Sequence, residues 1–463
     1  MKQMFDIDLA VFKRYDKPGP RYTSYPTAPK FSKDFGSSEF EKEICNTNTS
    51  ENKIPLSLYF HIPFCDTLCY FCGCNMLVTH ERQKISDYLS CLQKEIDHVT
   101  RYVSQTRPVV QMHWGGGTPT YLNPDEIKRL GNYIQQNFSF AGKELEASCE
   151  IDPRGLTREH IAALKEAGFN RLSMGVQDFE EKVQRAVNRV QPESVTRAAL
   201  EWGRELGFQS INLDLIYGLP FQTLKSFEHT LHRIIEINPD RLAVFNYAHV
   251  PWLKKHMSLI KSEDLPTPDQ KLSILKMTIE TLIAAGYVYI GMDHFAKPSD
   301  ELAIAQTHRT LYRNFQGYST KSGTEVYALG MSAISQLQEV YAQNAKTLPE
   351  YYEAVSRGNF ATQLGYRMSA DDHIRKKVIM TLMCDFELDE EKIEKEFGIC
   401  FEKYFEKDLP KLSEFIQDGF MVREKGKILV QGMGRLLIRN IVMAFDAYLS
   451  DMIKDKPVFS RTV

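Results

Sequence analysis

The chain has 463 residues, with 43% hydrophobic and 25% charged side chains, so we expect a globular protein of about two or three domains. Its 57 basic and 60 acidic residues leave a formal charge of −3, which favours neither nucleic acid nor an anionic membrane as a partner. Because no apolar run is long enough to span a bilayer and the N-terminus lacks the apolar core of a signal peptide, we expect a cytoplasmic protein without membrane insertion.

Residues 1–53 are predicted to form an irregular N-terminal extension. Its stretch 17–31 reads KPGPRYTSYPTAPKF. Proline fixes φ and removes a backbone donor, so this stretch is expected to be extended or turned. Free linkers rarely carry three aromatic residues as close together as Tyr22, Tyr25 and Phe31. We therefore expect the extension to wrap over the functional site.

From residue 54 to about 300, short β-branched or aromatic runs alternate with amphipathic helical patterns. The runs predict strands at 56–62, 109–114, 145–151, 171–176, 210–216, 241–248 and 287–292. One intervening helix is predicted to begin at Asn123, with Pro124 in the first turn and Glu126 completing a capping box. Six or seven parallel βαβ units in a row predict an α/β fold, a partial (β/α) TIM-like barrel, with its chemistry at the carboxyl ends of the strands.

The rhythm stops after about residue 300. Residues 301–365 are predicted to be a loop-rich connecting segment. Residues 366–463 are predicted to form a mainly helical C-terminal domain, with a hairpin turning at Lys425 and Gly426.

Four cysteines follow the first predicted strand within FHIPFCDTLCYFCGCN, residues 60–75. Cys65, Cys69 and Cys72 are spaced so that one short loop can offer three thiolates to an iron–sulfur cluster, which leaves one iron open to a non-protein ligand. A zinc loop is the main alternative, but zinc sites usually pair two Cys-xx-Cys knuckles, and no second knuckle occurs. One residue separates Cys72 from Cys74, so both reaching one cluster is awkward, and we expect Cys74 not to be a ligand. Phe71 would shield the cluster or stack on a ligand base.

Polar and glycine residues follow the other predicted strands. The run Gly115-Gly116-Gly117-Thr118-Pro119 comes after the second strand and is no phosphate-loop or dinucleotide fingerprint, so we expect it to let the backbone approach a ligand. Four further residues could grip ribose hydroxyls or a carboxylate group, although each alone could be an ordinary polar residue at the end of an element. They are Glu150, Gln177, Arg189 and Asp214.

The cysteine loop followed by a GGGTP turn resembles the radical S-adenosylmethionine (SAM) superfamily. Longer motifs resemble one of its families, the bacterial oxygen-independent coproporphyrinogen III oxidases. These motifs include PRYTSYPTA (20–28), HWGGGTPTYL (113–122), NRLSMGVQDF (170–179), LDLIYGLP (213–220) and RNFQGY (313–318). The resemblance implies an oxidoreductase of heme (porphyrin) biosynthesis that decarboxylates two propionate side chains of coproporphyrinogen III and gives protoporphyrinogen IX.

The resemblance also implies the cofactors, a [4Fe–4S] cluster and two SAM molecules. Cys65, Cys69 and Cys72 match the cluster ligands, and Cys74 matches a fourth, non-ligating cysteine. Positions matching the first SAM site are Tyr59, Phe71, Gly116, Glu150, Ala248 and Ile334. Positions matching the second are Gly117, Thr118, Gln177, Arg189 and Asp214. No catalytic residue is implied beyond the cluster and SAM.

A substrate with four carboxylates needs cations, and candidates lie in the distinctive motifs of the N-terminal extension and of the distal half of the chain. They are Arg21, Lys297, Arg313, Arg435 and Arg439. The expected partners are the substrate, an electron donor for the cluster and a terminal electron acceptor, and we expect a monomer. A heme-binding chaperone of the same fold and an anaerobic heme-opening radical enzyme are the alternatives. Relatives of the chaperone type lack the long N-terminal extension, so its presence favours the oxidase.

Overall fold

The structure is a computed structural model that describes residues 5–49, 51, 53–452 and 459–462. The chain divides into two compact units. Unit 1 comprises residues 1–30, 216–322 and 368–463, and unit 2 comprises residues 31–215 and 323–367. The predicted four-part division, with boundaries near residues 53, 300 and 365, stays a prediction.

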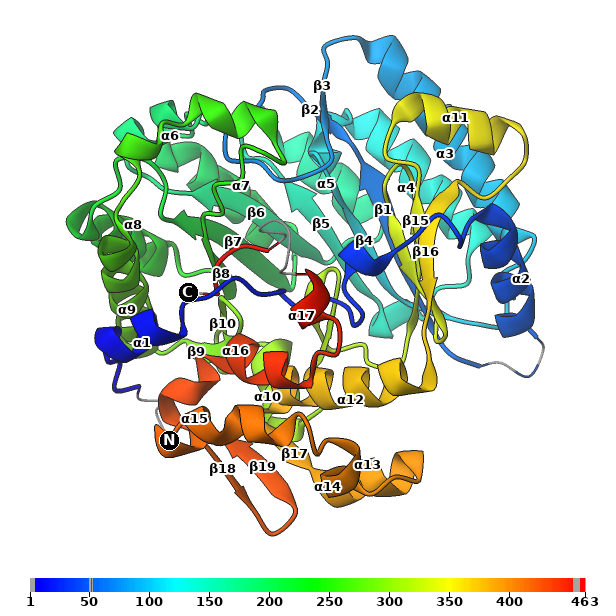
Figure 1. Cartoon of the computed structure of the whole chain (residues 1–463). Coiled ribbons are helices and arrows are strands. Elements are labelled where there is room, and N and C mark those ends of the chain that lie inside the picture. The colour runs from blue at the N-terminus through cyan, green and yellow to red at the C-terminus, as the bar shows by residue number, and fades with distance from the viewer. Residues whose placement is uncertain (1–4, 50, 52, 453–458, 463) are drawn as a thin grey trace. The chain divides into compact units, whose positions relative to one another are not determined.

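Unit 2 is built on a parallel sheet whose strands run in the order β13-β1-β4-β5-β6-β7. The strands that follow the predicted pattern are β1 (Leu56–Ile62), β4 (Val109–Gly116), β5 (Glu146–Ile151), β6 (Arg171–Gln177) and β7 (Ser210–Tyr217). The helices between them are α3 (Arg82–Thr100), α4 (Pro124–Asn137), α5 (Arg158–Glu166), α6 (Glu181–Ala186) and α7 (Glu193–Glu205), and α3, α4 and α5 lie side by side along the strands in Figure 1. The predicted α/β fold with parallel βαβ units is confirmed.

Local sequence explains these elements. Strand β1 is buried along almost its whole length, as expected of a strand covered on both faces. Helix α4 begins at the predicted cap, because the Asn123 side chain accepts from the Glu126 backbone N–H at 2.9 Å and the Glu126 side chain accepts from Asn123 N–H at 2.8 Å.

The prediction of a loop-rich segment at 301–365 was wrong. Strand β13 (Glu325–Leu329) pairs in parallel with β1, and the sheet continues antiparallel through β14 (Ile334–Gln336), β15 (Val340–Asn344) and β16 (Thr362–Arg367), with α11 (Leu348–Ser356) between the last two. These strands are short, and β13 is buried at every position, so it shows no alternation to read. Its partner β1 lies far earlier in the chain, which local pattern cannot reveal.

Unit 1 contains a second strand arrangement, in the order β8-β10-β9. Its strands are β8 (Arg241–Asn246), β9 (Val288–Gly291) and β10 (His294–Ala296), with α8 (Leu224–Ile237), α9 (Pro268–Ala284) and α10 (Glu301–His308) around them in sequence. The strand predicted at 287–292 exists as β9, but it pairs antiparallel with β10 and is not another parallel unit. The cause is the tight turn at Met292 and Asp293, both at positive φ, which returns the chain at once as a hairpin.

The rest of unit 1 is mainly helical, as predicted for the C-terminal part of the chain. Its helices include α12 (Ala370–Asp385), α13 (Glu390–Phe397), α14 (Phe401–Tyr404), α15 (Ser413–Gln417), α16 (Ile438–Val442) and α17 (Leu449–Met452). Its strands are the hairpin pair β11 (Tyr312–Asn314) and β12 (Gly317–Ser319), followed by β17 (Glu387–Asp389), β18 (Met421–Glu424) and β19 (Lys427–Val430). The hairpin predicted around Lys425 and Gly426 is confirmed by the pairing of β18 with β19.

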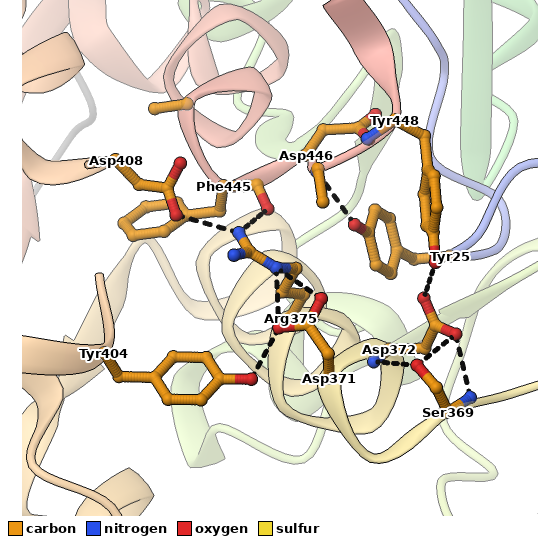
Figure 2. Close-up of polar contacts among 12 residues, drawn as sticks. Tyr25, Ser369, Asp371, Asp372, Arg375, Tyr404, Asp408, Phe445, Asp446 and Tyr448 are labelled. Carbon is orange, nitrogen blue, oxygen red and sulfur yellow. Dashed lines mark hydrogen bonds and ion pairs between the residues drawn. The ribbon is translucent and has the colours of Figure 1, made fainter. Parts of the chain in front are cut away.

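Helix α12 is tied to the end of the chain by a polar network (Figure 2). Arg375 donates to Asp408 and to the Phe445 carbonyl, each at 2.9 Å, and to Asp371 within its own helix at 2.8 Å. The Tyr448 hydroxyl donates to Asp372 at 2.8 Å. These bonds fix residues 445–448, the segment that the N-terminal extension contacts.

The N-terminal extension is more regular than predicted, because it contains α1 (Leu9–Tyr15) and α2 (Ser37–Thr47). Its aromatic residues are buried, as expected: Tyr22 and Tyr25 in unit 1, and Phe31 in unit 2, where it stacks on Tyr341. Within the described residues, no helix combines the length and the apolar character needed to cross a membrane.

Candidate active site

The cysteine loop leaves the sheet at the carboxyl end of β1. Cys65 ends the two-residue strand β2 (Phe64–Cys65), which pairs in parallel with β3 (Leu77–Val78). The Leu77 N–H also donates to the Pro63 carbonyl at 2.7 Å. The loop between these strands is therefore closed at its base, and Cys69, Cys72 and Cys74 all lie within it.

A single cavity of about 230 Å³ in unit 2 brings most of the predicted site residues together. The predicted residues that line it are Cys65, Cys69, Phe71, Cys72, Gly117, Thr118, Glu150, Gln177, Arg189 and Asp214. They come from segments that follow or end β1, β4, β5, β6 and β7. The cavity therefore lies where parallel strands end, the usual place for chemistry in α/β proteins.

The thiols suit a group larger than one ion. Among the residues that the structure describes, no three His, Cys, Asp or Glu side chains gather closely enough to hold a single metal ion. Cys65, Cys69 and Cys72 nevertheless share one cavity, and the Thr118 hydroxyl lies 3.5 Å from the Cys65 sulfur. Burial raises the pKa of Cys65 to about 12, so binding a metal cluster there would have to displace the thiol proton.

Two arginines place positive charge beside one of these sulfurs. Arg154 Nη2 lies 3.5 Å and Arg189 Nη1 3.6 Å from Cys69 Sγ. Asp152 bridges both guanidinium groups, at 2.7 Å and 3.0 Å. Cationic donors beside a sulfur suit a negatively charged ligand group, so this corner of the cavity fits an anionic thiolate–metal group. Sequence reasoning missed Arg154, because its only signal is its position just after the strand-end Asp152.

The glycine run allows the second strand end to approach the cysteine segment. The Gly117 N–H donates to the Ile62 carbonyl at 2.9 Å and the Thr118 N–H to the Phe64 carbonyl at 2.8 Å. A Cβ atom on Gly117 would lie 2.7 Å from the Pro63 carbonyl, so a larger residue would push the two segments apart. Gly116, at φ +121°, donates its N–H to a Glu150 oxygen at 3.2 Å.

Behind Glu150 lies a set of rings that the sequence had not singled out as functional, apart from Tyr59. His113 Nε2 lies 3.3 Å from a Glu150 oxygen, and the His113 ring stacks on Tyr59 with 5.8 Å between centroids. His61 bonds to the Asn75 carbonyl through Nε2 at 2.8 Å, so Nε2 carries the proton and Nδ1 accepts from the Tyr59 hydroxyl at 3.1 Å. Burial lowers the pKa of His61, which keeps the ring neutral. These contacts orient Glu150 and Tyr59.

Asp214, in β7, and Gln177, at the end of β6, both line the cavity. The Asn212 side chain donates to Asp214 at 2.7 Å. Burial raises the pKa of Asp214 to about 7, so its charge is held less firmly than that of a surface carboxylate. Gln177, at φ +70°, has a buried side-chain oxygen without a hydrogen-bond partner among the described residues. An unpartnered acceptor at a cavity wall fits a ligand that brings a donor, such as a hydroxyl or an ammonium group.

Arg189 is held more tightly than its predicted carboxylate-binding role required. Its Nε donates to Gln191 at 3.1 Å and its Nη2 to the Gly175 carbonyl at 2.7 Å, in addition to the contacts of Nη1 with Asp152 and Cys69. Of its five N–H donors, this leaves one for a ligand.

The remaining predicted residues do not line the cavity. Tyr59 and Gly116 lie in the layer behind it, in contact with His61 and Glu150 respectively. Ile334 begins β14 in unit 2. Ala248 follows β8 in unit 1, so a role for it at this cavity stays a prediction.

Comparison with known proteins gives two family matches. The Radical SAM superfamily profile matches residues 59–234, and the HemN C-terminal domain profile matches residues 368–437. The first match spans the cysteine loop and every residue that lines the cavity.

Full-length relatives are also found. The chain is 50% identical, over 100% of its length and 99% of the relative, to the "Oxygen-independent coproporphyrinogen III oxidase" of Escherichia coli (strain K12). It is 45% identical to the protein of the same name from Synechocystis sp., over 99% of this chain and 98% of that relative. A solved structure described as "Coproporphyrinogen III oxidase (HemN) from Escherichia coli is a Radical SAM enzyme" matches with a TM-score of 0.91 and 49% identity, covering 96% of this chain and 100% of that one.

Proposed function

Because this chain belongs to the oxygen-independent coproporphyrinogen III oxidases of the radical SAM superfamily, we propose that it converts two propionate side chains of coproporphyrinogen III to vinyl groups. The product is protoporphyrinogen IX. Each conversion releases carbon dioxide, one proton and two electrons from a propionate carboxylate. The observation that carries the proposal is the single cavity that gathers the cysteine triad with Gly117, Glu150 and Asp214, in a chain similar to these oxidases over its full length.

Three thiolates, from Cys65, Cys69 and Cys72, would hold a [4Fe–4S] cluster. When bound, the cluster and SAM supply the radical that removes a hydrogen atom from the propionate carbon next to the ring. Two SAM molecules, implied by the family, would be held by the glycine turn and by Glu150, Gln177, Arg189 and Asp214. Carboxylates of this kind accept hydrogen bonds from ribose hydroxyls, and the Gly116 N–H orients Glu150 at 3.2 Å.

The protein's own part is orientation and shielding. His113 and Gly116 hold Glu150, and Asp152 holds Arg154 and Arg189 against the Cys69 sulfur. Phe71 and Met76 contribute apolar surface to the cavity, which would limit water at a reactive centre. We propose that the protein works as a cytoplasmic monomer. An electron donor would reduce the cluster, and a terminal electron acceptor would take up electrons released from the substrate.

The test is an anaerobic assay of the reconstituted protein with SAM, a reductant and coproporphyrinogen III. We expect protoporphyrinogen IX to form. If none forms while heme binds tightly, the protein is a heme chaperone, and if heme is opened, it is the related heme-opening enzyme; either result overturns the proposal.

Two cysteine variants test the ligand set. Cys69→Ala removes a proposed ligand and should lose both iron content and activity. Cys74→Ala removes a cysteine of the same loop outside the proposed set and should retain the cluster by iron and sulfide analysis. Loss of the cluster in Cys74→Ala and its retention in Cys69→Ala would contradict the assignment.

A further inference from the structure

Five cations were candidates for the substrate carboxylates, and their contacts within unit 1 distinguish four of them. The fifth, Arg435, has a buried Nε without a hydrogen-bond partner among the described residues, and its guanidinium lies 4.3 Å from the centre of the Phe386 ring. Arg439 is 4% exposed and donates to the carbonyls of Gly19, Pro20, Ser460 and Arg461, so its donors are engaged by the backbone. Lys297 donates to the Asn238 carbonyl at 3.0 Å and pairs with Asp240 near the surface. Both therefore have structural roles.

Arg313 is different. It is 3% exposed, yet its Nε and Nη1 atoms have no hydrogen-bond partner among the described residues. Its Nη2 makes one long bond, 3.4 Å, to the Arg21 carbonyl, and its guanidinium lies 4.7 Å from the centre of the Tyr318 ring. The ring supports one face of the guanidinium, while Nε and Nη1 are two separate donors that no acceptor among the described residues satisfies.

The hairpin that carries Arg313 has further unpartnered donors. The side-chain nitrogens of Asn314 and Gln316 are buried without a hydrogen-bond partner in the described part of the chain. The Gln316 N–H donates to Asn314 Oδ1 at 2.9 Å, which fixes the orientation of that amide and leaves its NH₂ group unpaired. All these unpartnered atoms are donors, so the chemistry they lack is an acceptor.

Arg21 lies next to this hairpin and is held firmly in place. Arg439 grips the two residues before it, and Tyr22, which has a φ of 45°, donates its hydroxyl to Asp446 at 2.8 Å. The Tyr25 hydroxyl accepts from the Ala447 N–H at 3.0 Å, in the segment drawn in Figure 2. A non-glycine residue at positive φ is costly and persists only where its surroundings impose it. The extension is thus preorganised around Arg21.

Positive charge exceeds negative charge in this cluster. Arg21 pairs with Asp293 at 2.9 Å, and the Asp293 side chain is 19% exposed. Burial lowers the pKa of Arg439, and so does the charge of Arg21. Burial and the charge of Arg313 lower the pKa of His294 to about 4, so this ring adds no further cation near pH 7. Arg21, Arg313, Arg435 and Arg439 thus bring four positive charges to a cluster in which Asp293 is paired with Arg21. A buried charge without a partner is unfavourable.

We propose that Arg313 and Arg21 form a binding subsite for one propionate carboxylate of the substrate, an inference that rests on the proposed function. Arg21 lines a cavity of about 40 Å³ together with Asp293 and Asn246. Arg313 supplies its unpartnered Nε and Nη1 donors, and Arg21 exchanges part of its pairing with Asp293 for the substrate. The bound anion offsets the charge excess of the cluster.

The test compares Arg313→Met and Arg313→Lys with the wild-type holoenzyme. Affinity is measured by fluorescence with coproporphyrin III, which has four carboxylates, and with its neutral tetra-amide. Loss of a charge-assisted bond of about 1.5–3 kcal/mol predicts that Arg313→Met weakens coproporphyrin binding roughly 10- to 150-fold. Arg313→Lys should recover part of the affinity, because it keeps the charge but loses the fork. Arg21→Met should weaken binding less, since Asp293 already competes for it.

The controls separate this subsite from a folding defect and from the proposed function. Lys297→Met removes an equal charge from unit 1 and should leave affinity unchanged. Iron content, SAM binding and the melting temperature should be unaltered in Arg313→Met, and the tetra-amide should bind wild type and Arg313→Met equally. Wild-type affinity for coproporphyrin III in Arg313→Met overturns the subsite. Failure of the wild type to make protoporphyrinogen overturns the proposed function instead, and leaves the binding comparison intact.

Discussion

Arg107 in unit 2 and Arg313 in unit 1 are both almost completely buried, with 1% and 3% of the residue exposed, but their charges are satisfied in opposite ways. In unit 2, Arg107 donates to the Ile54 carbonyl at 2.8 Å, to Asn48 at 2.7 Å and to Glu325 at 2.5 Å. In unit 1, Arg313 makes one long bond, and its Nε and Nη1 have no hydrogen-bond partner among the described residues. Both have side chains hidden from solvent, so exposure alone does not distinguish them.

The two arginines differ in the acceptors that the fold supplies to each guanidinium group. Arg107 has a carboxylate of its own chain, whose side chain is 1% exposed, so its role is complete within the fold. In the cluster around Arg313, the carboxylate of Asp293 is already paired with Arg21. A buried cation satisfied by the protein serves stability, whereas one left short of acceptors is suited to an anionic ligand. Substitution of each should therefore change different observables.

The largest expected effect is on the free energy of unfolding in Arg107→Met. This change leaves Glu325 buried without its partner and should destabilise the protein by about 3–5 kcal/mol. Urea unfolding measures the loss, and the same substitution at Arg313 is the matched control, expected to change stability by no more than about 1 kcal/mol. If the two variants lose equal stability, the contrast between the two sites fails.

Glu95 in unit 2 is a third buried ionisable residue, and it has hydrogen-bond donors but no ion-pair partner among the described residues. Its oxygens accept from Gly330 N–H, the Asn344 side chain and the Tyr351 hydroxyl, each at 2.7 Å. Burial nevertheless raises the pKa of Glu95 from 4.5 to about 7. The folded protein therefore holds this proton more tightly than the unfolded chain, so the stability from this group is present at pH 4.5 and is lost as the pH rises through 7.

Glu95→Gln should remove that dependence. Relative to the variant, the wild type should lose about 3 kcal/mol of unfolding free energy between pH 4.5 and pH 8. Parallel unfolding curves at several pH values test this expectation. A constant difference across that range would show that Glu95 is charged when folded, and that unit 2 tolerates an uncompensated charge as unit 1 does.

The smallest expected effect concerns Arg154, a cation whose acceptors include a sulfur. It pairs with Asp152 and also lies 3.5 Å from Cys69 Sγ. Arg154→Leu should lower the reduction potential of the reconstituted cluster by tens of millivolts, because the reduced, more negative cluster loses a cationic donor. Potentiometric titration gives the value, with Arg158→Leu as a surface control. An unchanged reduction potential would show that Arg154, like Arg107, has a structural role and does not tune the cluster.

Much of the parallel sheet in unit 2 could be predicted, because its strands are β-branched or aromatic runs of six to eight residues separated by amphipathic helices. The strands β13–β16 were missed because they are short, apart from β16, and because β13 pairs with β1, a segment far away in the chain. At the site, the cysteine triad, the glycine turn and the strand-end Glu150, Gln177 and Asp214 were found by position and do share a cavity. Arg154, His61 and His113 were missed, since single polar residues near strand ends carry no distinctive spacing.

By itself, the sequence determined which reactive groups are present: three cysteines at cluster spacing, a glycine run after a strand, and carboxylates at strand ends. Local covalent spacing fixes these, so no tertiary contact was needed to read them. Only the tertiary structure decided which of the five candidate cations keep donors for a substrate, because that depends on whether the partners of each guanidinium or ammonium group come from elsewhere in the fold. Arg439 is engaged by backbone carbonyls from both ends of the chain, while Nε and Nη1 of Arg313 have no acceptor among the described residues.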